Sequence, residues 1–382
     1  MVPFKDALMA RTQILPTDAG AVKLWETEVA NEQKKKSKFT KMTGTEASKM
    51  PVVRKTSLED GPGDEVTMYL IAKMTGKPRE GAEKIAGYED KLNHFTDKLR
   101  IDKHRKAVNC GDIMDQKRVP FDIAEQVKAR LADYAAEVHD EQIIMNLSGS
   151  RGAGDEIQNY PVGYTGFPNT FTAPDADHNV IWDGSIAYNA LVQATHKLTT
   201  GVIDATRLKA TKYIGDLKSG KGAKMTPCAV DGGEHFVFLT GAEGMYDLRR
   251  EVGDAGFLTL QKAVMAAEGR QSVIFTGGDA MYNGTLICES ETIVKFTNAG
   301  AGTVRAMRSL YLGAHAVAVA YGVKGQTRGT RYELTESDLD HGEEEVVVMR
   351  LIAGYRKCRY NDLDHGVISV DHTYTFAPGA TI

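Results

Sequence analysis

Residues 120–149 read PFDIAEQVKARLADYAAEVHDEQIIMNLSG, the clearest helical pattern in the chain. Pro120 suits the first helical position, Asp122 suits the first turn, and Gly149 is a typical stop. Between them runs one apolar stripe at helical spacing, made of Ile123, Val127, Leu131, Tyr134, Val138 and Leu147. About 28 residues at ~1.5 Å rise give a rod of roughly 40 Å. We therefore expect a spine helix over residues 119–148, against which the rest of the fold packs.

Residues 64–108, before this helix, are charged, rich in turns and poor in core-forming side chains. EVTMYLIAKM (65–74) alternates like a strand and puts Met68 and Leu70 on the face opposite Tyr69 and Ile71. GKPREG then forms a turn. The spacing beyond it predicts a short helix over 82–95 and a strand that ends near residue 108.

Residues 1–62 hold few large apolar side chains and contain the basic run NEQKKKSKFTK. Such a segment buries too little surface to fold alone, so we expect an extended arm that docks elsewhere. A frayed tail fits the composition equally well. The run could contact phosphate groups, but Phe39 is its one aromatic residue, so stacking on bases is not expected.

The C-terminal half mixes helices and strands without a regular β-α-β order, which favours an α+β fold. Residues 149–183 read as a loop-rich stretch, and helices are expected near 185–198 and 203–214. VRAMRSLYLGAHAVAVAYG (304–322) is apolar nearly all round and is interpreted as a buried helix. Strands are expected at 235–241, 272–277, 284–290, 343–360 and 366–371.

Composition excludes several classes of protein. The 382 residues are 42% hydrophobic and 26% charged, enough for a sizeable core. Their formal net charge of −4 argues against duplex binding by the whole surface. No run reaches the ~18 apolar residues of a membrane span and no secretory signal is visible, so we expect a soluble intracellular product. The four cysteines form no C-x-x-C pair, which is typical of buried thiols in a reducing compartment.

Two stretches could carry chemistry. GDLKSGKG (215–222) nearly spells a phosphate-binding loop, but Gly222 replaces the hydroxyl residue and no strand precedes it. NDLDHGVISVDH (361–372) clusters Asp362, Asp364, His365, Asp371 and His372, either as a metal site or as a turn between two strands. No G-x-S-x-G elbow and no local Cys–His pair is present. We therefore expect no catalytic residue, no metal site and no cofactor.

Eight stretches, taken together in their order along the chain, resemble one family of tailed-bacteriophage major capsid proteins, the group typified by the coat protein of coliphage N four. LRIDKHRKAVNCG is similar to its "ID…R.AV" signature at Ile101, Asp102, Arg105, Ala107 and Val108. The other seven are GDEVTMYLIAKMTG, KIAGYEDKL, HDEQIIMNLSG, HFVFLTGAEGMYDLRRE, NGTLICES, MRSLYLGAHAVAVAYG and MRLIAGYRKCRYNDLDHGVISVD. Together they cover roughly residues 60 to 371, although 149–235 and the arm carry little of the resemblance.

The resemblance implies the Hong Kong 97-type coat fold, an α+β fold. Its parts would be an N-terminal arm (1–62), an extended loop or E-loop (63–110), a peripheral domain with the spine helix (111–225), an axial domain (226–335) and C-terminal strands that return to the peripheral domain (336–382). An arm and a loop without cores of their own suit a subunit that completes its burial on neighbours.

The implied function is a major capsid protein that assembles itself into hexamers and pentamers of an icosahedral head around double-stranded DNA. The implied partners are a separate scaffolding protein, a portal and a cement protein, with assembly in the host cytoplasm and no membrane contact. A bacterial nanocompartment shell and a nucleotide- or metal-dependent enzyme are the alternatives. Charge and position select Glu83, Lys84, Glu89, Lys91, Lys98, Arg100 and Asp102 as inter-subunit contacts. The same criteria select Lys34, Lys35, Lys36 and Lys38 on the arm as facing a neighbour or the genome.

Overall fold

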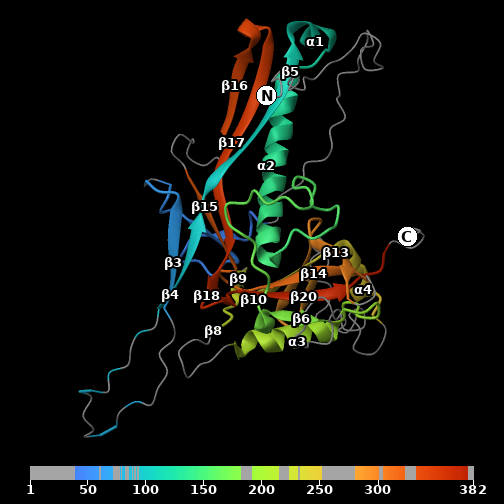
Figure 1. Ribbon diagram of the computed structural model, residues 1–382. Coiled ribbons are helices and arrows are strands. Elements are labelled where there is room, and N and C mark those ends of the chain that lie inside the picture. The colour runs from blue at the N-terminus through green and yellow to red at the C-terminus, as the bar shows by residue number, and fades with distance from the viewer. Residues whose placement is uncertain are drawn as a thin grey trace, which may run out of the picture.

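Two large sheets and one long helix form the body of the protein (Figure 1). The computed structural model describes residues 39–59, 62–71, 94–181, 192–214, 223–230, 233–251, 280–300, 304–322 and 333–376. Between 72 and 93 it also describes residues 78, 80, 81, 86, 87, 89 and 92. Over these residues the fold is α+β, as the sequence predicts.

The first sheet has six strands and is organised around β17 (Glu344–Lys357). β5 (Asp102–Asp112) pairs antiparallel with one edge of β17. β16 (Glu333–Leu339) and β15 (Val317–Tyr321) share the other edge, β16 toward the start of β17 and β15 toward its end. The parallel strands β2 (Val52–Lys55) and β1 (Thr43–Gly44) extend the sheet beyond β15.

The second sheet has eight strands around β14 (Val304–Leu312). Its main path runs β11-β12-β10-β14-β20-β6, while β9 pairs with β10 and β13 pairs with β14. The bounds are β6 (Asn179–Ile181), β9 (Cys228–Val230), β10 (Gly233–Thr240), β11 (Ala280–Tyr282), β12 (Thr285–Glu289), β13 (Val294–Ala299) and β20 (Val367–Thr373).

The spine helix is α2 (Ile123–Ser148), which stands on the second sheet and lies along the first (Figure 1). Asp122 caps it by accepting a hydrogen bond from the Glu125 amide, and Gly149 ends it in the left-handed conformation with φ 69°. A Cβ at Gly149 would lie 2.1 Å from the Thr172 carbonyl oxygen, so this stop requires glycine. The predicted start at residue 119 was four residues early, because Asp122 is the cap and Pro120 lies before the helix.

Alternation along β10 explains how the second sheet becomes the central layer of a sandwich. Val237 and Leu239 join the core shared with α2, whereas Phe236 and Phe238 join the core on the opposite face. α3 (Thr200–Thr211) and α4 (Ala242–Arg249) contribute to that second core, and α3 lies below the sheet in Figure 1. Helices thus cover both faces.

The smaller elements lie around this body. Three hairpin-like pairs are β3 (Glu65–Ile71) with β4 (His94–Arg100), β7 (Tyr213–Ile214) with β8 (Ala223–Lys224), and β18 (Arg359–Tyr360) with β19 (Leu363–Asp364). Short helices are α1 (Ile113–Arg118), η1 (Ala176–His178) and η5 (Asp340–Gly342).

Several element predictions are corrected. The predicted helix 304–322 is wrong: it is two strands, β14 and β15, joined by a turn in which His315 has φ 56°. Both strands are covered on both faces, so they lack the alternation that marks a half-buried strand. Residues 192–198 are not helical, and α3 covers 200–211 rather than 203–214. Residues 94 and 95 begin β4, and residues 86 and 87 form a turn. The predicted strand 272–277 and most of the predicted helix 82–95 lie outside the described residues.

The sheets draw their strands from across the predicted domain boundaries. β6 and α3 precede residue 226 but belong with the second sheet, and β15 leaves that region to join the first. β20 returns to the second sheet while β16 and β17 return to the first. The described part of the predicted arm, 39–59, docks on its own subunit through β1, β2 and the buried Phe39.

Candidate assembly surfaces

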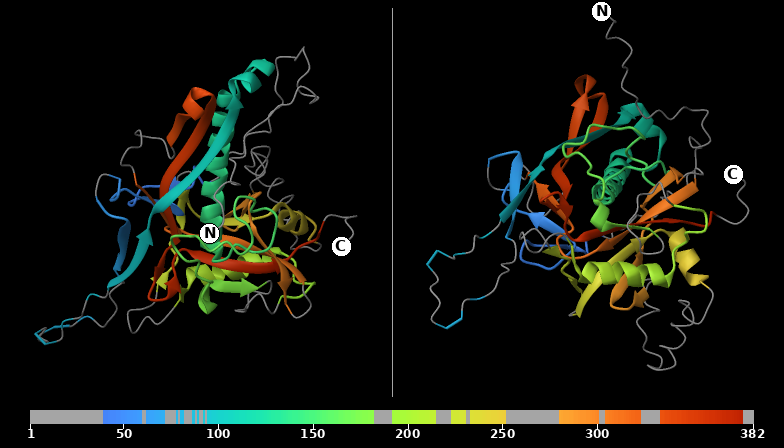
Figure 2. Two further views of the ribbon diagram at one scale, coloured as in Figure 1. Left: turned by 45° about the horizontal axis from the view of Figure 1, so that its top comes forward. Right: turned by 60° about the horizontal axis from the view of Figure 1, so that its bottom comes forward.

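The β3–β4 hairpin stands at the side of the body and leaves one face open (Figure 2). Its inner face packs Met68 and Leu99 against Ala318 and Ala320 of β15 in one buried cluster. The small alanine side chains let the hairpin lie close to the sheet. Its outer face carries alternate residues of both strands and has no cover in the isolated subunit.

Lys98 and Arg100, two of the predicted contact residues, lie on this outer face. Lys98 Nζ is 2.7 Å from Glu65 Oε1, and Arg100 Nε is 3.7 Å from Asp64 Oδ2. The two cationic side chains remain 67% and 62% exposed, so both pairs contribute little to folding. The pairing leaves a mixed-charge surface that a second molecule could contact.

The other predicted contact residues have different surroundings. Asp102 is exposed and accepts a hydrogen bond from the Lys103 amide at 2.7 Å. Glu89 is exposed, and hydrogen bonds from its own backbone and from the Gly87 amide lower the pKa of its carboxyl. Glu83, Lys84 and Lys91 lie outside the described residues. So do Lys34, Lys35, Lys36 and Lys38.

Charge-based reasoning missed two apolar contact candidates on the same outer face. Tyr69 is 68% exposed and Ile71 is 63% exposed, with Thr96 and His94 as their partners across the hairpin. Large apolar side chains this exposed on an open strand are typical of a surface that another molecule covers. The signal was available, because the alternation of 65–74 already places both residues opposite the buried Met68.

A second exposed apolar site lies at the N-terminal end of the spine helix, on the short helix α1. Ile113 and Met114 of α1 are exposed there. Beside them is a cavity of about 520 Å³ whose lining includes Asp112, Asp338 and Glu343. An acidic hollow next to exposed apolar side chains gives this tip a surface character distinct from that of the hairpin.

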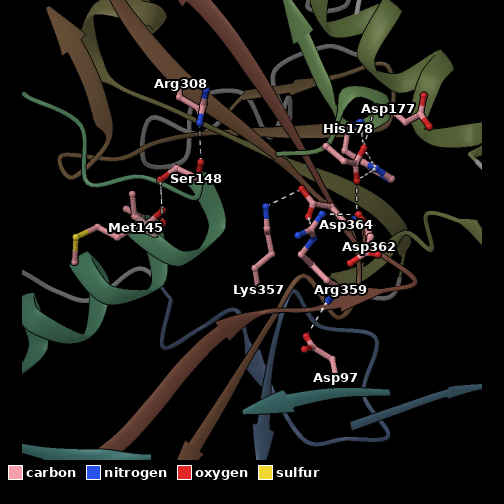
Figure 3. A network of polar contacts seen from close by, with 12 residues as sticks. Asp97, Met145, Ser148, Asp177, His178, Arg308, Lys357, Arg359, Asp362 and Asp364 are labelled. Carbon is pink, nitrogen blue, oxygen red and sulfur yellow. Dashed lines mark hydrogen bonds and ion pairs between the residues drawn. The ribbon is translucent and has the colours of Figure 1, made fainter. Parts of the chain in front are cut away.

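A buried polar network lies under the root of the hairpin, where the two sheets meet (Figure 3). Asp97 of β4 faces Arg356 of β17, with Oδ1 2.8 Å from Nη2, and its Oδ2 accepts from the Arg359 amide at 3.2 Å. Asp364 takes ion pairs from Lys357 at 2.7 Å and from Arg359 at 3.0 Å. The network therefore connects the hairpin to strands of the body.

Electrostatics within this network follow from burial. Burial raises the pKa of the Asp364 carboxyl and lowers that of the Lys357 ammonium, while the ion pair between them opposes both shifts. Burial also acts to raise the pKa of Asp175, but hydrogen bonding and charge from His178 outweigh it and leave that pKa lowered. Asp175 in turn accepts from the Asp364 amide at 2.6 Å. These charges compensate one another inside the subunit.

One further buried ion pair fixes the spine helix to the second sheet, and Figure 3 shows its arginine, Arg308, in contact with Ser148 at the end of the helix. Arg308 of β14 and Asp371 of β20 are register partners and form two parallel hydrogen bonds of 2.7 and 2.8 Å. A third donor of Arg308 reaches the carbonyl of Ser148, the last residue of α2, at 2.8 Å. The positive charge of Arg308 is also stabilised by the negative end of the helix dipole at this position.

The cluster 361–372 is therefore structural. Asn361 and Asp362, with φ 55° and 62°, form the two-residue turn between β18 and β19, so the turn interpretation is confirmed. Asp364 and Asp371 are paired with cations in separate places. Among the described residues, no three His, Cys, Asp or Glu side chains group to hold a metal ion. The loop 215–222 lies outside the described residues.

The thiols do not form a nucleophilic site. All four cysteines are buried and unbridged, and burial raises the pKa of Cys228 and Cys358 to about 12. In the part of the chain that the structure describes, no helix is long and apolar enough to cross a membrane.

Comparisons with known proteins agree with this arrangement. A family model described as phage capsid protein matches residues 14–376. The major capsid protein of Pseudomonas phage KPP25 is 24% identical over 355 residues, which cover 86% of this chain and 88% of that protein.

Solved capsid structures match nearly the whole chain. The capsid of Ralstonia phage GP4 is 35% identical with a TM-score of 0.81, covering 97% of this chain and all (100%) of that one. The capsid of cyanophage Pam1 is 21% identical with a TM-score of 0.71, covering 98% and 99% of the two chains. The fold is thus the Hong Kong 97-type coat fold. The chain belongs to the phage capsid protein family, and it is a structural subunit of the head rather than an enzyme.

Proposed function

We propose that this chain assembles into the hexamers and pentamers of an icosahedral phage head that encloses double-stranded DNA. The observation that carries the proposal is the β3–β4 hairpin, whose outer face exposes Tyr69 and Ile71 beside Lys98 and Arg100. A lone subunit leaves this surface in water, whereas a ring of subunits can bury it in heterologous contacts that close on themselves.

The two sheets correspond in this proposal to the two domains of a coat subunit. The first sheet and α2 would form the peripheral domain, and the second sheet with α3 and α4 the axial domain around the centre of each ring. The β3–β4 hairpin would be the E-loop. This assignment follows the sheets, so it replaces the linear boundaries at residues 225 and 335.

The contact assignments extend the same proposal. Lys98, Arg100, Asp102 and Glu89, with Glu83, Lys84 and Lys91, would contact neighbouring subunits, and Lys34, Lys35, Lys36 and Lys38 would face a neighbour or the packaged DNA. We place the chain in the coliphage N four group. Scaffolding, portal and cement proteins would be its separate partners during assembly in the host cytoplasm.

Reversing two charges on the hairpin tests the contact surface. We expect the double variant Lys98→Glu/Arg100→Glu to give at least about tenfold fewer closed shells, because like charges brought together at an interface cost several kcal/mol. The subunit itself should fold, since both exposed pairs contribute only ~0.2–1 kcal/mol. Shells are counted by electron microscopy after sedimentation, and folding is followed by circular dichroism.

A matched control makes the same change of net charge elsewhere. Lys212→Glu/Arg249→Glu alters exposed cations at the C-terminal ends of α3 and α4. Neither cation lies on the hairpin face, so this control should give at least about fivefold more closed shells than Lys98→Glu/Arg100→Glu. Normal shells from Lys98→Glu/Arg100→Glu would contradict the assignment of this face.

A further inference from the structure

The hairpin joins the body through a very short connection. β4 ends at Arg100 and β5 begins at Asp102, so Ile101 alone separates the hairpin from the first sheet. The Ile101 amide donates a hydrogen bond to the Asp64 carbonyl at 2.9 Å, which holds the two ends of the hairpin together where it meets the body. The direction in which the hairpin leaves the body is therefore decided within a few residues.

Asn169 holds the last residue of the hairpin by its backbone. Its Oδ1 accepts from the Arg100 amide at 3.0 Å, and its Nδ2 donates to the Arg100 carbonyl at 2.8 Å. The same Nδ2 donates to the Tyr355 carbonyl of β17 at 3.1 Å. The amide orientation is fixed, because the nitrogen faces two carbonyl oxygens and the oxygen faces an N–H. Asn169 is 5% exposed and comes from the loop after α2.

The surrounding backbone is shaped for this contact. A Cβ on Gly354 would lie 2.1 Å from the Arg100 carbonyl oxygen, so glycine lets β17 approach the root of the hairpin. Three separate segments, the loop, the hairpin and β17, thus meet at one carboxamide group. A buried polar group with all these partners is costly to disturb and specifies one geometry.

The hairpin has a second anchor three residues earlier. Asp97 is held by Arg356 and by the Arg359 amide, as described above. Two anchors at different points along β4 fix its direction, whereas one anchor leaves it free to pivot. Between the anchors, Met68 and Leu99 pack in a small apolar cluster with Leu58, Ala318, Ala320 and Cys358.

We propose that Asn169 is a positioning residue that sets the angle of the hairpin on the body and thereby the curvature of the assembled shell. This inference rests on the proposed function, because the hairpin must contact a neighbouring subunit for its angle to determine curvature. Asn169 makes the contact within one subunit, and its effect appears between subunits.

Asn169→Ala tests the inference, with Gln158→Ala as the control. Gln158 is exposed in the same loop. We expect Asn169→Ala subunits to unfold cooperatively, to exchange the Arg100 amide about tenfold faster than the wild type, and to form shells of mixed diameter. Gln158→Ala should match the wild type in all three. Asn169→Ala shells of one wild-type diameter, with unchanged exchange at Arg100, would overturn the proposal.

The wild-type protein supplies a second test that needs no variant. In unassembled subunits the Arg100 amide should exchange at least about tenfold more slowly than those of Ile71 and His94 at the far end of the hairpin. Equal rates would overturn the inference even if Asn169→Ala failed to fold. If the wild type formed no shell at all, the proposed function would fail, while the exchange rates would still decide the role of Asn169.

Discussion

Arg308→Met is expected to lower the free energy of unfolding by about 3–5 kcal/mol, because it leaves the carboxylate of Asp371 buried without its cation. Asp371 is 0% exposed, and Arg308 supplies both of its ion-pair hydrogen bonds. The change also removes the donor to the Ser148 carbonyl at the end of α2. Urea denaturation of unassembled subunits measures the effect.

Two comparisons make this result specific. The double variant Arg308→Met/Asp371→Leu removes both charges and should recover most of the loss, because an apolar pair replaces a buried ion pair at little cost. Lys128→Met breaks the exposed ion pair with Glu336 and should cost less than about 1 kcal/mol. An Arg308→Met variant as stable as Lys128→Met would contradict the structural role of the buried pair.

Acidification is expected to destabilise the subunit through His372. Its Nδ1 lies 2.8 Å from the Thr373 carbonyl oxygen, so Nδ1 carries the proton of the neutral ring, and its Nε2 lies 2.8 Å from Ser309 Oγ. Burial lowers the pKa of His372 below its ordinary value of 6.5, despite the opposing hydrogen bond to Thr373 and the charges of Asp371 and Asp247. Between the ordinary and the lowered pKa, the unfolded chain binds a proton that the folded chain does not. The contribution of His372 to the free energy of unfolding is therefore fully present above pH 6.5. It falls as the pH drops below 6.5, by about 1.4 kcal/mol per pH unit.

His372→Asn isolates this contribution from other groups. The partly buried His365, whose pKa burial lowers to about 4, acts in the same direction in both proteins and cancels in the comparison. Unfolding free energies of the two proteins at pH 7.5, 6.5 and 5.5 should converge as the pH falls, because only the wild type loses the His372 contribution. A difference that stays constant over this range would show that His372 titrates normally in the folded subunit.

The sequence predicts elements whose pattern has one clear period. α2 has an uninterrupted apolar stripe, and β10, β12, β17 and β20 are dense aliphatic runs, so all five lie within a few residues of prediction. β14 and β15 were mistaken for a helix because burial on both faces removes the period. Element type is readable where one face meets water and ambiguous where neither does.

The contact surface was partly predictable, and the root of the hairpin was not. Alternation places Tyr69 and Ile71 outward, and charge drew attention to Lys98 and Arg100 on the same face. Nothing in the loop sequence FPNTF marks Asn169, because its role depends on the long-range approach of Arg100 and Tyr355. The pairing of strands as distant as β6 and β20 likewise depends on tertiary packing that local patterns do not encode.

The size of the assembled protein tests the central claim most directly. The concentrated protein, alone and co-expressed with a phage scaffolding protein, is examined by sedimentation velocity, and its fast fraction by electron microscopy. We predict a fast species consisting of closed shells built from rings of subunits. A species that stays monomeric or dimeric under both conditions would contradict it.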